Sequence, residues 1–155
     1  MKKTISAILM LVVGVLVYLN EQGVLPGTPA DGVGNSGPAI STSADGTREI
    51  AEAYRAQRSD VQVRGEGVVK KILRDDLKGS RHQRFLLRLS NNQTLLVAHN
   101  IDLAPRIDDL REGDRVAFYG EYEWNNQGGV LHWTHHDPGG RHADGWLKHQ
   151  GRTYQ

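Results

Sequence analysis

Cysteine is absent from this chain of 155 residues. The absence excludes disulfide bonds and thiolate metal sites, so a bound metal ion would need imidazole and carboxylate ligands. An excess of charge of either sign is also missing, because 19 Lys and Arg residues against 18 Asp and Glu residues give a formal net charge of +1. This balance predicts no strong non-specific attraction to nucleic acid, although a local basic groove is compatible with it.

Charged residues are missing from positions 5–19, directly after Lys2 and Lys3. A short positive segment followed by an apolar one is typical of an export signal. A helix over positions 5–19 would reach about 22 Å, short of a bilayer core of about 30 Å, but flanking residues or bilayer thinning could cover the difference. We expect residues 1–19 to be a signal peptide or signal anchor, with residues 4–19 in the inner membrane. The remainder would then be periplasmic, or secreted if the signal is cleaved.

Large apolar residues are scarce from position 20 to position 45, where Gly, Pro, Ser, Asn and Ala are common. This composition predicts a flexible linker. The expected domain covers residues 46–155. It begins with a short amphipathic helix over residues 47–58, because Ile50, Ala53 and Tyr54 follow a helical spacing.

From Val61 the apolar residues alternate with polar ones, as in β-strands. We expect five strands, over residues 61–73, 83–89, 94–98, 115–124 and 130–136. Residues 101–110 are predicted to form a loop with a short helix, and residues 137–155 a glycine-rich tail. The predicted fold is mainly β, a five-stranded barrel like the oligonucleotide/oligosaccharide-binding (OB) fold with one short helix. Six-stranded and SH3-like barrels would give similar patterns.

Several sequence blocks in the second half are distinctive: HNIDLAPR at 99–106, GEYEWN at 120–125, HWTHHDP at 132–138, RH at 141–142 and GW at 145–146. Through them, the segment from about residue 82 to the end resembles a family of small exported bacterial proteins known as a domain of unknown function. The resemblance implies a compact exported domain. It brings no activity with it, so the site is argued from chemistry.

Histidine is missing from the first 81 residues, and all seven histidines lie between His82 and His149. Imidazoles and carboxylates close together in a sequence can bind a metal ion, move a proton or hold a phosphate. We expect a divalent ion, Mg²⁺, Mn²⁺ or Zn²⁺. Its candidate ligands are His135, His136, Asp137 and His142.

Strand geometry limits how these ligands can converge. Residues i and i+2 of a strand lie on the same face, about 6.6 Å from each other, so His135 and Asp137 could bind one ion. His132 and His136 are four apart and could not do so on a straight strand. His142 could join if the glycine-flanked loop folded back. The alternative is a solvated loop whose histidines cap turns.

A second candidate group lies at the end of the third predicted strand, which in an OB barrel can approach the fifth. His99 could act as a general acid or base, and Asn100 could orient a water molecule or a substrate oxygen. The predicted catalytic residues are His99, Asn100, His132 and His135.

Glu121 and Glu123 share one face of the fourth predicted strand. These paired carboxylates face the histidine strand and could complete a metal site, or could be ordinary charges of an edge strand.

Substrate contacts are expected from cationic and aromatic side chains. Arginine pairs with phosphate and tryptophan stacks on bases or sugars. The candidates are Arg84, Arg106, Trp124 and Arg141. The alternatives are a solvated basic surface for the hairpin that carries Arg84, and an ion pair with Asp108 or Asp109 for Arg106.

Three classes of function fit these features. The first is a metal-dependent phosphodiester hydrolase, most simply a nuclease. The second is a non-catalytic module of the periplasm that binds nucleic acid or glycan. The third is a periplasmic metal-binding protein. The sequence favours the hydrolase, because it alone uses both the histidines and the basic and aromatic residues.

Overall fold

The computed structural model describes residues 42–155 of the chain. The predicted signal or anchor over residues 1–19 and most of the predicted linker lie outside the described residues. No helix of the described part is long and apolar enough to cross a membrane. The elements follow in the order α2 (Thr42–Arg55), β1 (Val61–Ile72), β2 (His82–Arg88), β3 (Thr94–Asn100), β4 (Arg115–Glu123), β5 (Val130–His132), β6 (Trp146–His149) and β7 (Arg152–Tyr154).

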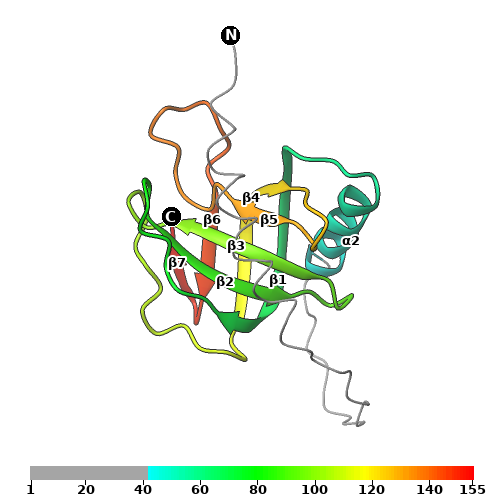
Figure 1. Cartoon of the computed structure of the whole chain (residues 1–155), viewed down its shortest axis with the longest axis horizontal. Helices are drawn as coiled ribbons and strands as arrows, with labels where there is room; N and C mark the ends of the chain where they lie inside the picture. The colour runs from blue at the N-terminus through cyan, green and yellow to red at the C-terminus, as the bar shows by residue number, and fades with distance from the viewer. Residues whose placement is uncertain (1–41) are drawn as a thin grey trace. The chain divides into compact units, whose positions relative to one another are not determined.

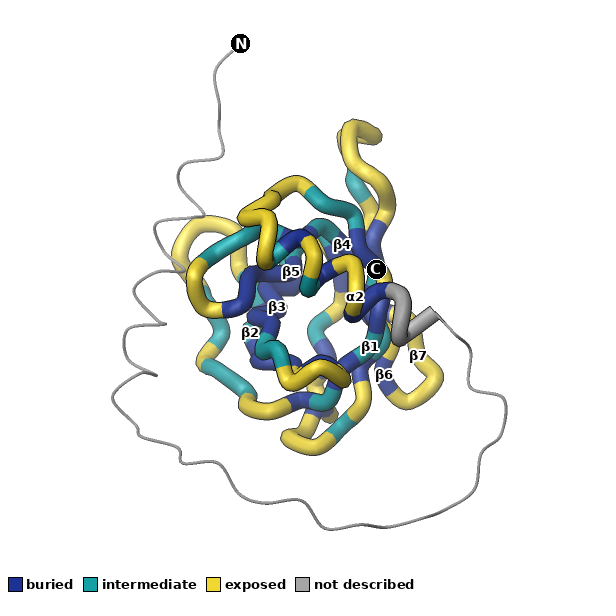
Figure 2. The backbone as a smooth tube through the Cα atoms, turned by 90° about the vertical axis from the view of Figure 1, so that its right-hand side faces the viewer, coloured by how far each residue is buried: buried dark blue, intermediate teal, exposed yellow. Residues whose placement is uncertain are grey.

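Five of the strands close into a barrel, which Figure 2 shows as a ring. Around the ring the order is β1-β2-β3-β5-β4, and β4 pairs back onto β1. The β3–β5 pairing is parallel and the other pairings are antiparallel. The prediction of a mainly β fold with a five-stranded barrel is therefore confirmed, and the closed ring is consistent with an OB-like barrel.

The long strand β1 closes the barrel because it bends and serves two neighbours. It pairs with β4 from Val61 to Val68 and with β2 from Val68 onward, with a register shift between Val69 and Lys71. Gly65 lies in the first half, where a Cβ would approach the Phe118 ring to 2.9 Å. Glycine within a strand favours such a bend and close approach, and the bulge follows a few residues after it.

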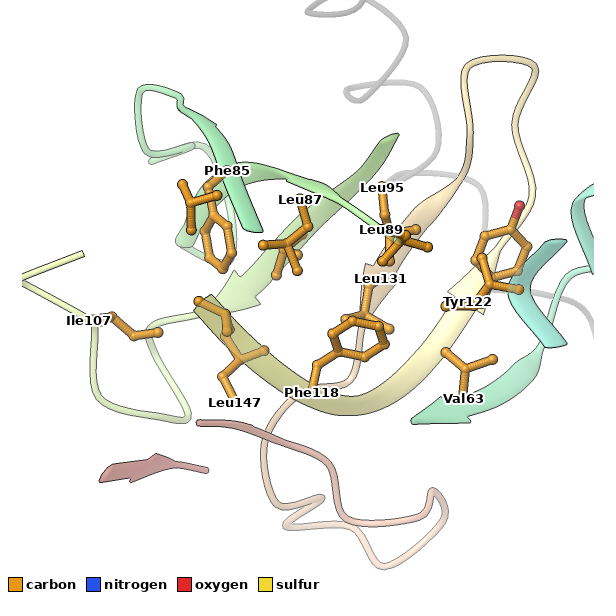
Figure 3. Packing of buried hydrophobic residues seen from close by; sticks show 14 of the residues in the cluster. Val63, Phe85, Leu87, Leu89, Leu95, Ile107, Phe118, Tyr122, Leu131 and Leu147 are labelled. Atoms are coloured by element: carbon orange, nitrogen blue, oxygen red, sulfur yellow. The ribbon is translucent and has the colours of Figure 1, made fainter. Parts of the chain in front are cut away.

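The barrel is filled by side chains from alternate strand positions (Figure 3). One end is closed by α2, which contributes the fully buried Ile50 and Ala53. The other end is closed by Ile107 and Leu110 from the β3–β4 connection. The helix thus lies before the first strand, and both ends of the core are covered.

The predicted short helix within residues 101–110 is wrong, since this connection consists of turns. Its backbone is held by side chains instead. Gln83 donates from Nε2 to the carbonyl of Ile107 at 2.8 Å and accepts from the Ile107 amide at 2.9 Å. These two bonds replace the helical ones and direct Ile107 into the barrel.

The C-terminal part departs most from expectation. β5 ends at His132 because Trp133 has a left-handed backbone, with φ 51°. The predicted tail contains two strands, β6 and β7, joined by Gln150 and Gly151, whose φ values of 47° and 78° suit a tight hairpin. β6 pairs with the first half of β4, so the sheet continues past the barrel.

Candidate metal centre on the outer face of β4 and β5

The register of β4 and β5 brings two glutamates beside a histidine. Tyr122 is fully buried in the core, so its neighbours Glu121 and Glu123 project from the outer face of β4. Leu131 is likewise buried, so His132 projects outward from β5. Glu121 and His132 are direct partners in the register, which places their side chains next to each other.

We call Glu121, Glu123 and His132 the carboxylate–histidine cluster. Each offers one ligand atom, and these atoms all lie within 4.8 Å of one another. The Nε2 atom of His132 is 3.3 Å from Oε1 of Glu121 and 3.6 Å from Oε1 of Glu123. Within residues 42–155, this is the one group of three such side chains that could hold a metal ion.

The cluster is shielded from solvent but incompletely bonded. The side chains of His132, Glu121 and Glu123 are only 20%, 14% and 19% exposed. The Nε2 atom of His132 is buried and has no hydrogen-bond partner among the described residues, although a carboxylate oxygen of each glutamate lies within 3.6 Å. A buried polar atom without a partner is costly, so a ligand at this position would remove a penalty.

The two glutamates and the histidine shift one another's proton affinity. Burial lowers the pKa of His132, but the adjoining carboxylates of Glu121 and Glu123 outweigh it and raise that pKa above its usual value. The same histidine holds the pKa of both glutamates below the usual range, although burial opposes this. Without a metal ion, the two carboxylates therefore favour the protonated form of His132 more than water favours that of a free imidazole.

Asp60 adds a further carboxylate from the segment before β1. The negative charge of Glu123 raises the pKa of Asp60 above its usual value, and a hydrogen bond between the two carboxyl groups acts in the same direction. Asp60 has a left-handed backbone with φ 59°, a conformation that Asp tolerates better than most residues. Negative charge therefore exceeds positive charge around His132.

The loop between β5 and β6, orange in Figure 1, returns one more imidazole to the cluster. The His142 ring stacks on Trp133, with ring centroids 3.8 Å apart and an interplanar angle of 15°. This stack holds Nδ1 of His142 3.5 Å from Oε2 of Glu121. The loop thus folds back, but it brings His142 to Glu121 rather than to a ligand set with His135.

Two carboxylates and one imidazole are a suitable donor set for a divalent transition metal or Zn²⁺. The donors fit because two are negatively charged and the third has an unpartnered nitrogen. Three protein ligands would leave coordination positions for water or substrate, as in catalytic zinc sites.

The other predicted metal ligands lie apart from the cluster and have partners of their own. His135 is buried and donates from Nδ1 to the carbonyl of His136 at 2.6 Å, while His136 pairs through Nδ1 with Asp144 at 3.0 Å. Asp137 accepts the backbone amides of Arg141, Gly139 and His142, which lower its pKa to about 2. The structure does not bring these residues together as a ligand set, and their contacts hold the loop.

The predicted catalytic pair His99 and Asn100 also lies elsewhere. His99 is fully buried, with Nε2 3.1 Å from the carbonyl of Pro105 and Nδ1 2.8 Å from the hydroxyl of Thr134. Burial lowers the pKa of His99 to about 4, so the ring is neutral and joins the β3 end to the loop after β5. Asn100 accepts the amide of Asp102 and so forms a turn.

The predicted substrate contacts are engaged within the protein or point to solvent. Arg84 donates to the carbonyl of Arg74, at 3.1 Å from Nε and 2.9 Å from Nη2. Arg106 pairs with Asp75 at 2.9 Å and Asp108 at 3.0 Å, the second being an alternative raised by the sequence. Trp124 packs against the core, and Arg141 is exposed on the β5–β6 loop.

Sequence reasoning found part of this site and missed part. The shared face of Glu121 and Glu123 opposite the histidine strand was visible from the two-residue spacing, and so was His132. Asp60 was missed because it precedes β1, and no local pattern links it to β4. That His132 is the cluster's imidazole depends on the cross-strand register, which strand patterns alone do not fix.

Comparisons with known proteins agree with the resemblance in the sequence blocks. No curated protein matches the chain. Residues 35–155 match a family described as a protein of unknown function, DUF3465. The match includes the barrel, the carboxylate–histidine cluster and the β6–β7 hairpin, so the chain belongs to the DUF3465 family.

Proposed function

We propose that this protein binds a divalent metal ion at the carboxylate–histidine cluster and uses it to hydrolyse phosphodiesters, as a nuclease does. The observation that carries the proposal is the convergence of two carboxylates and an unpartnered imidazole nitrogen within 4.8 Å.

Electrostatics support a cation at this position. Glu121, Glu123 and Asp60 bring three carboxyl groups to one imidazole, and the pKa of Asp60 is raised by the charge of Glu123. Like charges held this close repel each other, and a divalent ion would neutralise them. A metal ion would also take the place of the proton that the raised pKa of His132 favours on its ring.

Hydrolysis is the reaction that such an ion can catalyse with the fewest additional side chains. A divalent ion with open positions polarises a phosphoryl oxygen and lowers the pKa of a bound water. His142 is 37% exposed and approaches Glu121 to 3.5 Å, so it is placed to accept or donate a proton at the edge of the cluster.

A metal-binding role without catalysis is the second candidate. The low exposure of the three side chains favours it, since exposures of 14% to 20% leave little access for a polymeric substrate. A cleavage assay separates the two functions.

The assay uses the full chain, freed of metal with EDTA, and single- and double-stranded DNA and RNA with Mg²⁺, Mn²⁺ or Zn²⁺ restored. We expect cleavage with at least one ion and none in EDTA. Glu121→Gln and His132→Gln each lower the rate at least about 100-fold, more than loss of a residue that only orients a ligand.

The matched control is His136→Gln, which removes an exposed imidazole outside the cluster and should keep the activity. Metal binding without cleavage of any substrate would select the second candidate. Equal cleavage by the cluster variants and the native chain would contradict a site at Glu121 and His132.

A further inference from the structure

A row of cationic and aromatic side chains lies beside the cluster, on the same outer face of the sheet. Arg64 of β1 is the register partner of Tyr119 of β4, and Tyr119 is the partner of Trp146 of β6. Lys148 follows two residues after Trp146 and so shares its face. Phe118 and Leu147 are fully buried, which directs these four side chains outward.

Trp146 is the centre of this row. The guanidinium carbon of Arg64 is 5.2 Å from the centroid of its ring, and the ammonium of Lys148 is 4.8 Å from it. The Tyr119 ring lies 6.3 Å away, tilted by 37°. We call Arg64, Tyr119, Trp146 and Lys148 the Trp146 surface.

The two cations of the Trp146 surface are available to a ligand. Both are exposed, and neither forms an ion pair with a carboxylate of the described residues. Glu66, two residues after Arg64 on β1, is itself paired with Arg115, with Oε1 2.9 Å from Nη1. An exposed cation–π contact is weak, so either cation can leave the indole for an anionic group.

We propose that the Trp146 surface binds single-stranded nucleic acid, with a base on the indole and phosphates on Arg64 and Lys148. Aromatic platforms flanked by cations suit this ligand, because every base has a stacking face and every linkage carries a charge. A duplex suits it poorly, since its bases are stacked on each other and cannot reach the ring.

The position of the surface relates it to the metal centre. Tyr119 and Glu121 are two residues apart on one face of β4, about 6.6 Å along the strand. A strand held on Trp146 therefore passes close to the carboxylate–histidine cluster. In this respect the inference rests on the proposed function, for which it supplies the substrate class.

The test measures fluorescence anisotropy of a labelled oligothymidylate against the full chain in EDTA, so that no metal chemistry contributes. Trp146→Leu, which keeps an apolar side chain on β6, should weaken binding about tenfold, within the range for loss of one stacked base. The double variant Arg64→Ala/Lys148→Ala should reduce the slope of log affinity against log salt by about 1.4, because each phosphate contact on a single strand contributes about 0.7.

The matched control is Lys78→Ala/Arg88→Ala, which removes two exposed cations from the basic β1–β2 hairpin. We expect this variant to bind like the native chain. A larger loss in the control than in Arg64→Ala/Lys148→Ala would overturn the inference and place the strand on the hairpin. Unchanged binding by Trp146→Leu would also overturn it. Heparin, which has charge but no bases, should bind Trp146→Leu and the native chain equally.

Failure of the inference can be told apart from failure of the proposed function. If Trp146→Leu binds normally while the native chain cleaves bis(p-nitrophenyl) phosphate with metal, the inference falls and the hydrolase stands. If the oligonucleotide binds through Trp146 while no phosphodiester is cleaved, the inference stands and the hydrolase falls.

Discussion

Two histidines show how surroundings decide what an imidazole does in this protein. His99 is fully buried and neutral, with Nε2 donating to the carbonyl of Pro105 and Nδ1 accepting from the hydroxyl of Thr134. His132 is partly buried beside two glutamates, which raise its pKa despite that burial. The first joins two segments of the fold, and the second is the imidazole of the proposed metal site. Their sequence contexts, each at or near the end of an apolar strand, do not separate them.

The neutrality of His99 makes the fold sensitive to acid. Its pKa is about 4 in the folded chain and about 6.5 when unfolded, so between these values the unfolded state holds the extra proton. The free energy of unfolding that neutral His99 contributes at pH 7 is therefore lost as the pH falls from 6.5 to 4. The loss amounts to at most about 3 kcal/mol. We expect His99→Gln to be less stable at pH 7 and to lose less stability over this interval.

Urea unfolding of both proteins at several pH values between 7 and 4 measures this difference. The control is Gln127→Ala, which removes an exposed side chain that carries no titratable group and should keep the native pH dependence. Parallel curves for His99→Gln and the native chain would mean that His99 is not the acid-sensitive group.

At the scale of elements, the sequence predicted the parts that follow a simple period. The strands β1 to β4 were located to within two residues, because alternation of apolar and polar residues determines which face is buried. The prediction of a short helix in the β3–β4 connection was wrong because Gln83, distant in sequence, supplies hydrogen bonds to its backbone. The hairpin of β6 and β7 was missed because both strands are short and begin after a glycine-rich loop.

The β4–β5 turn shows how closely backbone and side chain are fitted near the cluster. At Gly129, φ is 100° and a Cβ would lie 2.1 Å from the Tyr122 ring. We expect Gly129→Ala to destabilise the fold by about 2–5 kcal/mol, the sum of backbone strain and overpacking. A urea titration measures the loss.

Gly113→Ala is the matched control. Gly113 has a similar φ of 93°, but no atom lies within 4 Å of the place that a Cβ would occupy, so only strain applies, about 1 kcal/mol. An equal cost at both positions would show that contact with Tyr122 is unimportant.

At the scale of the whole molecule, the described residues form a closed barrel, and both proposed sites lie on its outer face. Apolar side chains of the barrel strands point inward and form the core. Ile50 and Ala53 cover one end of it, and Ile107 and Leu110 cover the other. On the outer face of β4, the carboxylate–histidine cluster and the Trp146 surface lie next to each other. Stability and proposed function thus use opposite faces of the same strand. The sequence could indicate that alternation, but not which neighbouring strands complete each group.

Metal binding at the cluster is the central claim, and calorimetric titration of the EDTA-treated full chain with Mn²⁺ or Zn²⁺ tests it most directly. The account predicts one ion per chain, with binding lost in Glu121→Gln and in His132→Gln and kept in His136→Gln. Binding that survives both cluster substitutions, or that disappears in His136→Gln instead, would contradict it.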